Sequence, residues 1–140
     1  MSLFKRKKIM SPKNPLGMAL FQYDNIIKKE LGGLLRTLSL GKSINPSRGE
    51  AILDKSMYKF DYILEDLSKD NLKIDYRSDK IRYGIINMIE DLKNYFERVR
   101  QYNFDGGRLS GDRNLKGPEK INEDREDLKK KMKDIESDYL

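Results

Sequence analysis

Hydrophobic residues recur every three or four positions along most of this 140-residue chain, which is the spacing of amphipathic helices. The first such stripe begins after Asn14-Pro15, a helix-start signal, and stops before Gly41, a typical helix end. Its members are Leu16, Leu20, Tyr23, Ile27, Leu31, Leu34 and Leu38. The pattern predicts one long helix, with a kink or a close helix crossing at Gly32-Gly33, because glycine weakens a helix interior.

Two further stripes are equally broad. One helix is predicted from Asn45-Pro46 to about Lys69, and Ser47 and Glu50 at its start have the spacing of a capping box. Its apolar positions are Leu53, Met57, Phe60, Leu64 and Leu67. Another helix is predicted to begin between residues 75 and 79, to end at Phe104, and to bury Ile81, Ile85, Met88, Ile89, Leu92, Phe96 and Val99. No segment alternates apolar and polar residues long enough to require a strand. We therefore expect an all-α protein with an antiparallel three-helix bundle over residues 15–104.

The C-terminal segment 118–140 has a different pattern. Its apolar residues form a narrow seam at coiled-coil spacing, made of Ile121, Leu128, Met132, Ile135 and Tyr139. We expect a charged helix that projects from the bundle or docks on a partner, with this seam as a protein interface. A glycine-rich loop at 105–117 would connect it to the bundle. In that loop Arg108 and Arg113 are a second candidate contact for an anion or a partner, and a simple connector is the alternative.

Charge is distributed unevenly along the chain. The formal net charge is +6, and the first fourteen residues contribute five cations and no acid. These cations are Lys5, Arg6, Lys7, Lys8 and Lys13. Segment 1–14 is therefore predicted to be a basic, extended arm that contacts nucleic acid, a phospholipid surface or an acidic protein. A solvated tail is the alternative interpretation.

Composition removes most catalytic chemistry. The chain has no Cys and no His, which excludes disulfides, thiolate nucleophiles and histidine-based catalysis or metal binding. Gly41-Lys42-Ser43 resembles the end of a phosphate-binding loop, but Arg36 stands where the first glycine would be, so a helix stop is the better interpretation. Adjacent acidic pairs point in different directions on a helix and indicate surface charge. We expect no enzyme activity, no cofactor and no metal.

These features suggest a partner-binding protein. No apolar run has the length of a signal peptide core or a membrane span, so we expect a cytoplasmic protein or one packaged within a virion or particle. The leading hypothesis is a non-enzymatic structural or assembly protein, oligomeric or in a hetero-complex, with protein neighbours; a phage or virus particle component would fit. The alternative is a small DNA- or RNA-binding accessory or regulatory protein, since arginines and tyrosines alternate along the third helix. No motif indicates a family.

Overall fold

The computed structural model describes residues 15–69 and 76–139, without the side chains of residues 76, 77 and 135–139. The basic arm with Lys5, Arg6, Lys7, Lys8 and Lys13 therefore lies outside the described residues. The part of the chain that is described is helical and contains no strand, which confirms the all-α prediction. Its elements are α2 (Pro15–Ile26), the π-helical turn η1 (Ile27–Leu31), α3 (Gly32–Ser39), α4 (Pro46–Leu67), α5 (Tyr76–Gln101), the short α6 (Gly106–Ser110) and α7 (Pro118–Tyr139).

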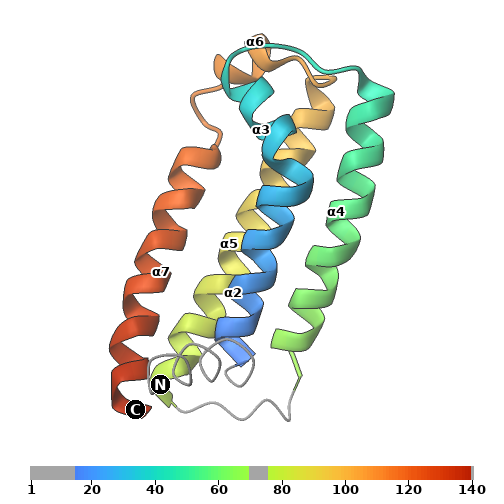
Figure 1. Cartoon of the computed structure of the whole chain (residues 1–140). Helices are drawn as coiled ribbons and strands as arrows, with labels where there is room; N and C mark the ends of the chain where they lie inside the picture. The colour runs from blue at the N-terminus through green and yellow to red at the C-terminus, as the bar shows by residue number, and fades with distance from the viewer. Residues whose placement is uncertain (1–14, 70–75, 140) are drawn as a thin grey trace, which may run out of the picture.

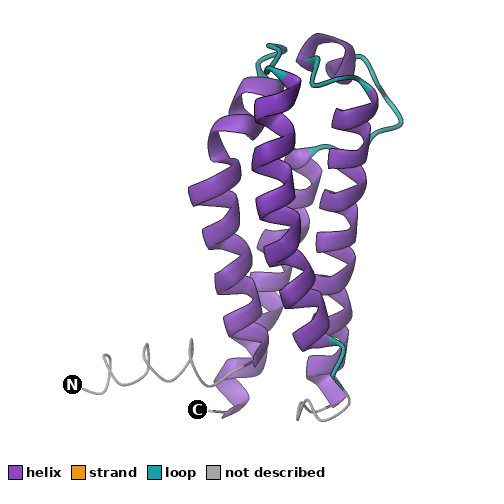
Figure 2. Ribbon diagram, turned by 90° about the vertical axis from the view of Figure 1, so that its right-hand side faces the viewer, coloured by secondary structure: helices purple, strands orange, loops and turns teal. Residues whose placement is uncertain are grey.

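The long helices run alternately up and down in a bundle (Figures 1 and 2). The continuous rod of α2, η1 and α3 rises, α4 descends, α5 rises again and α7 descends beside it (Figure 1). Helix α5 is central, because it packs against α2, α4, α6 and α7. The short α6 lies over the upper end of Figure 1, where α3 and α5 end and α4 begins.

The predicted stripes form one continuous core. Its fully buried members include Leu31, Leu53, Phe60, Ile85 and Phe96, contributed by η1, α4 and α5. Burying each such side chain contributes roughly 1.5–3 kcal/mol. The hydrophobic period therefore identified the buried faces of these helices correctly.

The helix ends around residues 40–45 are set by local hydrogen bonds. Gly41 has a φ of 75°, and its N–H donates to the Leu38 carbonyl at 3.0 Å, while the Lys42 N–H donates to the Thr37 carbonyl at 3.1 Å. This is the Schellman arrangement, and it confirms the helix stop. Helix α4 is capped by Asn45, whose Oδ1 accepts from the Arg48 N–H at 3.2 Å. The predicted capping box at Ser47 is therefore wrong, because the helix already begins at Pro46.

The irregularity expected at Gly32-Gly33 lies just before these glycines. Residues Ile27–Leu31 form a π-helical turn, and α-helical geometry resumes at Gly32. A π-turn inserts one extra residue into the helix and shifts the register of the side chains that follow. Here it brings Glu30 against α4, where its carboxylate bonds to Lys59.

The C-terminal helix departs from the prediction. Helix α7 runs along α5 within the same chain and does not project (Figure 1). The expected interface residues Ile121, Leu128 and Met132 are only 2%, 6% and 8% exposed and belong to the core. The described bundle is therefore larger than the predicted three-helix one, and this part of the seam is not available to a partner. Ile135 and Tyr139 lie on α7, but their side chains are outside the described part of the structure.

Two physical features let a narrow seam dock. Gly84 on α5 has no side chain where Leu128 packs, and a Cβ there would lie 2.4 Å from Leu128 Cδ2. Ion pairs then hold the margins of α7. Arg125 donates from Nε to Asp24 Oδ1 at 3.0 Å, and Lys116 Nζ lies 2.6 Å from Asp91 Oδ2. Neither the glycine slot nor these pairs, which join α7 and its preceding loop to α2 and α5, can be recognised from the period of α7 alone.

Candidate functional site

The upper end of the bundle is assembled from segments that are far apart in the sequence. Gly106 packs so closely on the 40–45 loop that a Cβ there would lie 2.2 Å from the Lys42 carbonyl oxygen. The Ile44 N–H donates to the Phe104 carbonyl at 3.1 Å, and the Phe104 ring packs directly on Gly49 of α4. As a result, the end of α3, the start of α4 and the segment around α6 form one surface.

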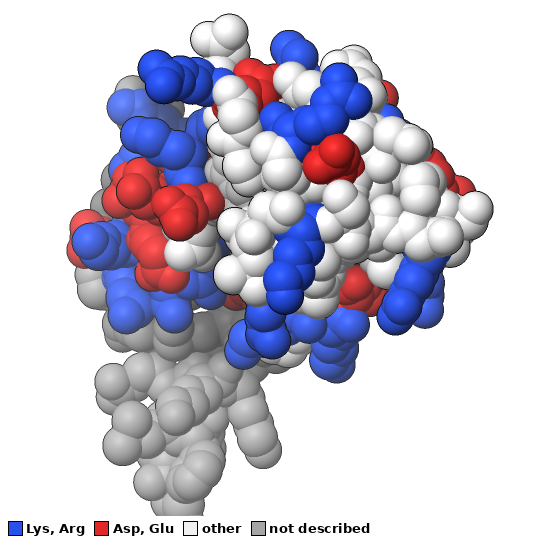
Figure 3. Space-filling view, turned by 90° about the horizontal axis from the view of Figure 1, so that it is seen from above, with Lys and Arg blue, Asp and Glu red and all other residues white. Residues whose placement is uncertain are grey.

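Five exposed cations lie on this surface, and none of them forms an ion pair with a residue that the structure describes. We call this set the basic end: Arg36, Lys42, Arg48, Arg108 and Arg113. Figure 3 looks down on it, and the largest group of acidic side chains there lies to the left, on the side where α7 runs in Figure 1. Along the side of the bundle, by contrast, Lys116 and Arg125 are each bonded to two carboxylates. Arg100, in the last turn of α5, is bonded to three, one of which is Glu50 near the start of α4.

Three carboxylates near these cations, Asp105, Asp112 and Glu50, are each engaged with groups of this chain, and Glu50 pairs with Arg100. Asp105 caps α6, because its Oδ1 accepts from the N–H groups of Gly107 and Arg108 at 3.0 and 3.2 Å. The Asp112 side chain is only 9% exposed, and its Oδ2 accepts from the Tyr102 hydroxyl at 2.9 Å. This hydrogen bond raises the pKa of Tyr102. These acids are therefore engaged with partners within the chain, whereas the five cations of the basic end are not.

The chemistry of the basic end suits phosphate groups. Four of its five cations are arginines, whose planar guanidinium groups donate two hydrogen bonds to one phosphate. The Arg108 guanidinium lies over the Tyr102 ring, 5.6 Å from its centroid, and remains exposed. Exposed cations contributed by separate segments at one end match a polymer of phosphates better than a small anion, which needs converging donors.

Two residues of this surface were candidates in the sequence, and their role as contacts stays a prediction. Arg108 and Arg113 were identified in the glycine-rich loop, and both lie on the basic end. Arg36, Lys42 and Arg48 were missed, because they lie about sixty residues earlier or more and join the site only through the fold. The available signal was the alternation of helix direction, which places every second connection at the same end of an antiparallel bundle.

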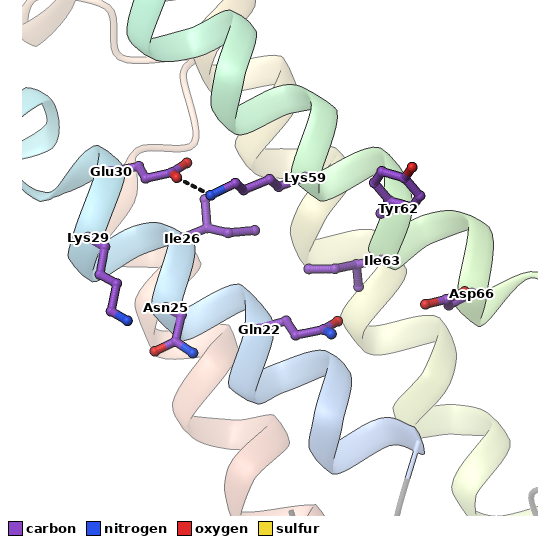
Figure 4. A pocket seen from close by; sticks show the side chains of 9 residues that line it. All are labelled: Gln22, Asn25, Ile26, Lys29, Glu30, Lys59, Tyr62, Ile63 and Asp66. Atoms are coloured by element: carbon purple, nitrogen blue, oxygen red, sulfur yellow. Dashed lines mark hydrogen bonds and ion pairs between the residues drawn. The ribbon is translucent and has the colours of Figure 1, made fainter. Parts of the chain in front are cut away.

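A second surface is a groove between the α2–η1 rod and α4. It has a volume of about 440 Å³, and the residues that line it are Gln22, Asn25, Ile26, Lys29, Glu30, Lys59, Tyr62, Ile63 and Asp66 (Figure 4). Its most buried charge is satisfied, since Glu30 bonds to Lys59 and accepts from the Ser56 hydroxyl at 3.5 Å. Tyr62 stands at its α4 edge, 55% exposed. The groove therefore offers shape and an aromatic rim, without converging catalytic groups among its lining residues.

Two other kinds of site are absent from residues 15–69 and 76–139. No group of three or more carboxylates there is placed to hold a metal ion. None of the helices in those ranges is both long and apolar enough to span a membrane. No family model, curated protein or solved structure matches the chain, so the basic end is interpreted from its own residues.

Proposed function

We propose that the protein is a non-enzymatic nucleic-acid-binding component of a larger complex, and that the basic end contacts the phosphate backbone. The observation that carries this proposal is the separation of charge at this end. Five cations are exposed without ion pairs to described residues, while Asp105 is engaged in capping α6 and the nearly buried Asp112 accepts from Tyr102. Contact with phosphates would release condensed counterions, and this release supplies most of the affinity of sequence-independent binding.

The arrangement predicts contact with the backbone and little recognition of bases. The five cations come from a helix end, a loop, the first turn of α4 and the α6 region. No continuous helix presents a row of them to a major groove, which is how base edges are commonly read. We therefore expect similar affinity for unrelated duplex sequences.

The first prediction tests the basic end directly. The triple variant Arg48→Gln, Arg108→Gln and Arg113→Gln removes three exposed charges without touching the core. Binding to a fluorescein-labelled DNA duplex is measured by anisotropy over a range of salt concentrations. The slope of log affinity against log salt is expected to become less steep by roughly 2.7, about 0.9 for each lost contact.

A matched control distinguishes the effect of losing these particular arginines from the effect of lowering the net charge. The variant Lys129→Gln, Lys130→Gln and Lys131→Gln removes the same charge from exposed positions on α7, where acids outnumber bases eight to six. It should leave the slope nearly unchanged. An equal loss in both variants would show that only net charge matters, and an unchanged slope in the arginine variant would remove the basic end as the contact.

The second candidate function is the structural or assembly role, which the sequence alone favours. The α7 seam no longer supports it, because Ile121, Leu128 and Met132 are buried within the chain. What favours it now is a pair of exposed aromatic side chains on α4, Tyr58 and Tyr62, which are 64% and 55% exposed. Tyrosine is enriched at protein interfaces, where its ring is buried and its hydroxyl group forms a hydrogen bond.

A further inference from the structure

The outward face of α4 carries an ordered stripe of side chains. Lys55, Tyr58, Tyr62 and Glu65 follow one another at intervals of three and four residues, with Ala51 one turn earlier, and all five are exposed. We call these residues the tyrosine stripe. It lies on the side of the helix opposite Phe60, which is completely buried. The spacing is that of a helix–helix seam, yet no element in the described part of this chain covers it.

The centre of the stripe is a preorganised aromatic pair. The rings of Tyr58 and Tyr62 meet edge to face, with centroids 5.0 Å apart and planes at 88°. Their hydroxyl oxygens lie 3.1 Å apart and share a hydrogen bond. Rings held in place by each other lose little conformational freedom when a second surface covers them, so such a pair is well suited to an interface.

The charges at the two ends of the stripe are opposite in sign, and they form no ion pairs within the described ranges. Lys55 lies on its N-terminal side and Glu65 on its C-terminal side, and neither forms an ion pair with any residue of the described ranges. The charged residues on the flanks of α4, by contrast, form ion pairs with other helices. Lys59 bonds to Glu30, Asp61 to Lys93 at 2.8 Å, and Asp54 to Arg100 at 3.3 Å. A partner that approaches the stripe therefore meets one free cation, two tyrosines and one free anion, in that order.

We propose that the tyrosine stripe binds a second copy of this chain, with the two α4 helices antiparallel. A two-fold axis at the level of Phe60 places Tyr58 opposite the partner's Tyr62. The same axis places Lys55 opposite the partner's Glu65, and symmetry forms that ion pair twice. A parallel arrangement would instead oppose like charges. The order of charges on α4 is therefore self-complementary in one orientation only.

The groove beside Tyr62 adds room for the second copy. It opens between α4 and the α2–η1 rod next to the stripe, and Gln22 and Asn25 on its far side can bond an incoming tyrosine hydroxyl (Figure 4). A single pair of helices buries less area than a standard stable interface. The dimer should accordingly be reversible and dependent on concentration.

Sedimentation equilibrium of the full chain without nucleic acid tests the proposal. The wild-type protein is measured from low micromolar to near-millimolar concentration, with the variants Lys55→Glu, Glu65→Lys and the double variant Lys55→Glu/Glu65→Lys. Each single reversal replaces the two symmetry-related ion pairs by two like-charge pairs. If each replacement costs about 0.7 kcal/mol or more of binding free energy, the two together should weaken dimerisation roughly tenfold or more. The double variant restores opposite charges and should dimerise like the wild type.

The control is Lys129→Glu, which reverses one exposed charge on α7 and should leave dimerisation unchanged. Helical circular dichroism verifies that every variant is folded. The proposal is overturned if the wild type stays monomeric throughout, if the single reversals dimerise as well as the wild type, or if the double variant is as weak as the singles. Because no DNA is present and neither charge belongs to the basic end, this result is independent of the proposed nucleic-acid binding.

Discussion

At the scale of single residues, Gly106 determines how the upper end is assembled. Its Cα approaches the backbone of the 40–45 loop so closely that a methyl group would meet the Lys42 and Leu38 carbonyl oxygens at 2.2 and 2.9 Å. Backbone atoms cannot move aside as a flexible side chain can. The position of Arg108 relative to Lys42 therefore depends on a residue that has no side chain.

Replacing Gly106 by Ala should destabilise the protein by about 1–3 kcal/mol, the usual cost of overpacking. It should also lower affinity for DNA, because α6 and Arg108 must shift. Urea unfolding and the anisotropy assay measure the two effects. Gly33→Ala is the control, because a Cβ at that position would have no neighbour within 4 Å and alanine favours a helix by about 1 kcal/mol. A Gly106→Ala variant as stable as the wild type would show that the loop moves freely.

At the scale of elements, α7 shows how a narrow apolar seam becomes part of a core. Three buried side chains would hold a helix of 22 residues poorly on a broad, flat surface. Here Gly84 opens a slot for Leu128, and Arg125 reaches across to Asp24 on α2. Two kinds of contact therefore hold this helix: its apolar side chains pack on α5, and an ion pair joins it to α2.

Helix α7 is consequently expected to be protected in the isolated monomer. Hydrogen exchange at dilution should be slow for amides between Ile121 and Met132, with rates set by unfolding of the bundle. Ile121→Ala should cost roughly 2–5 kcal/mol and speed exchange along α7. The neighbouring exposed Asn122→Ala should have little effect. Rapid exchange across α7 in the wild type would mean that the helix detaches and that its seam is free for a partner.

At the scale of the whole molecule, Pro15 and the basic end lie at opposite ends of the bundle. Residues 1–14, with five cations, precede Pro15 at the lower end of the bundle, and the basic end lies at the upper one (Figure 1). The rod of α2, η1 and α3 between them spans 25 residues, roughly 37 Å at about 1.5 Å per residue. This exceeds the Debye length of about 10 Å at moderate salt, so a charge held at the level of Pro15 couples only weakly to the basic end through the solvent.

If residues 1–14 and the basic end contact phosphates separately, deleting residues 1–13 and neutralising the basic end should have additive effects on DNA binding. Each change should reduce the salt dependence by its own number of lost contacts, and the combined variant by the sum. A duplex long enough to reach both ends is the probe for anisotropy titrations. If the deletion alone abolishes the salt dependence, the arm is the whole binding site. If it changes nothing, the arm is a solvated tail.

A feature of the fold could be predicted from the sequence where the residues that cause it lie close together along the chain. The period of the apolar residues located the buried faces of α2, α4 and α5, and Ile89 is completely buried as its stripe predicts. Leu64, on an equally regular stripe, is only partly buried, because it lies at the edge of the core. The stop at Gly41 was also visible, since a Schellman end is formed within six residues. In these cases the information lies within a few turns of chain.

Sequence by itself determined the helical class, the faces that are buried and the absence of thiol and imidazole chemistry, because periodicity and composition are properties of the chain alone. Tertiary structure decided which charges are free. Asp105 and Asp112 became hydrogen-bond acceptors for α6 and Tyr102, and Arg48 came to share a surface with Arg108 across sixty residues of sequence. It also decided that Ile121, Leu128 and Met132 face α5, since the slot at Gly84 exists only once two helices meet. Charge pairing and slot packing depend on distances between remote residues, and folding alone sets those distances.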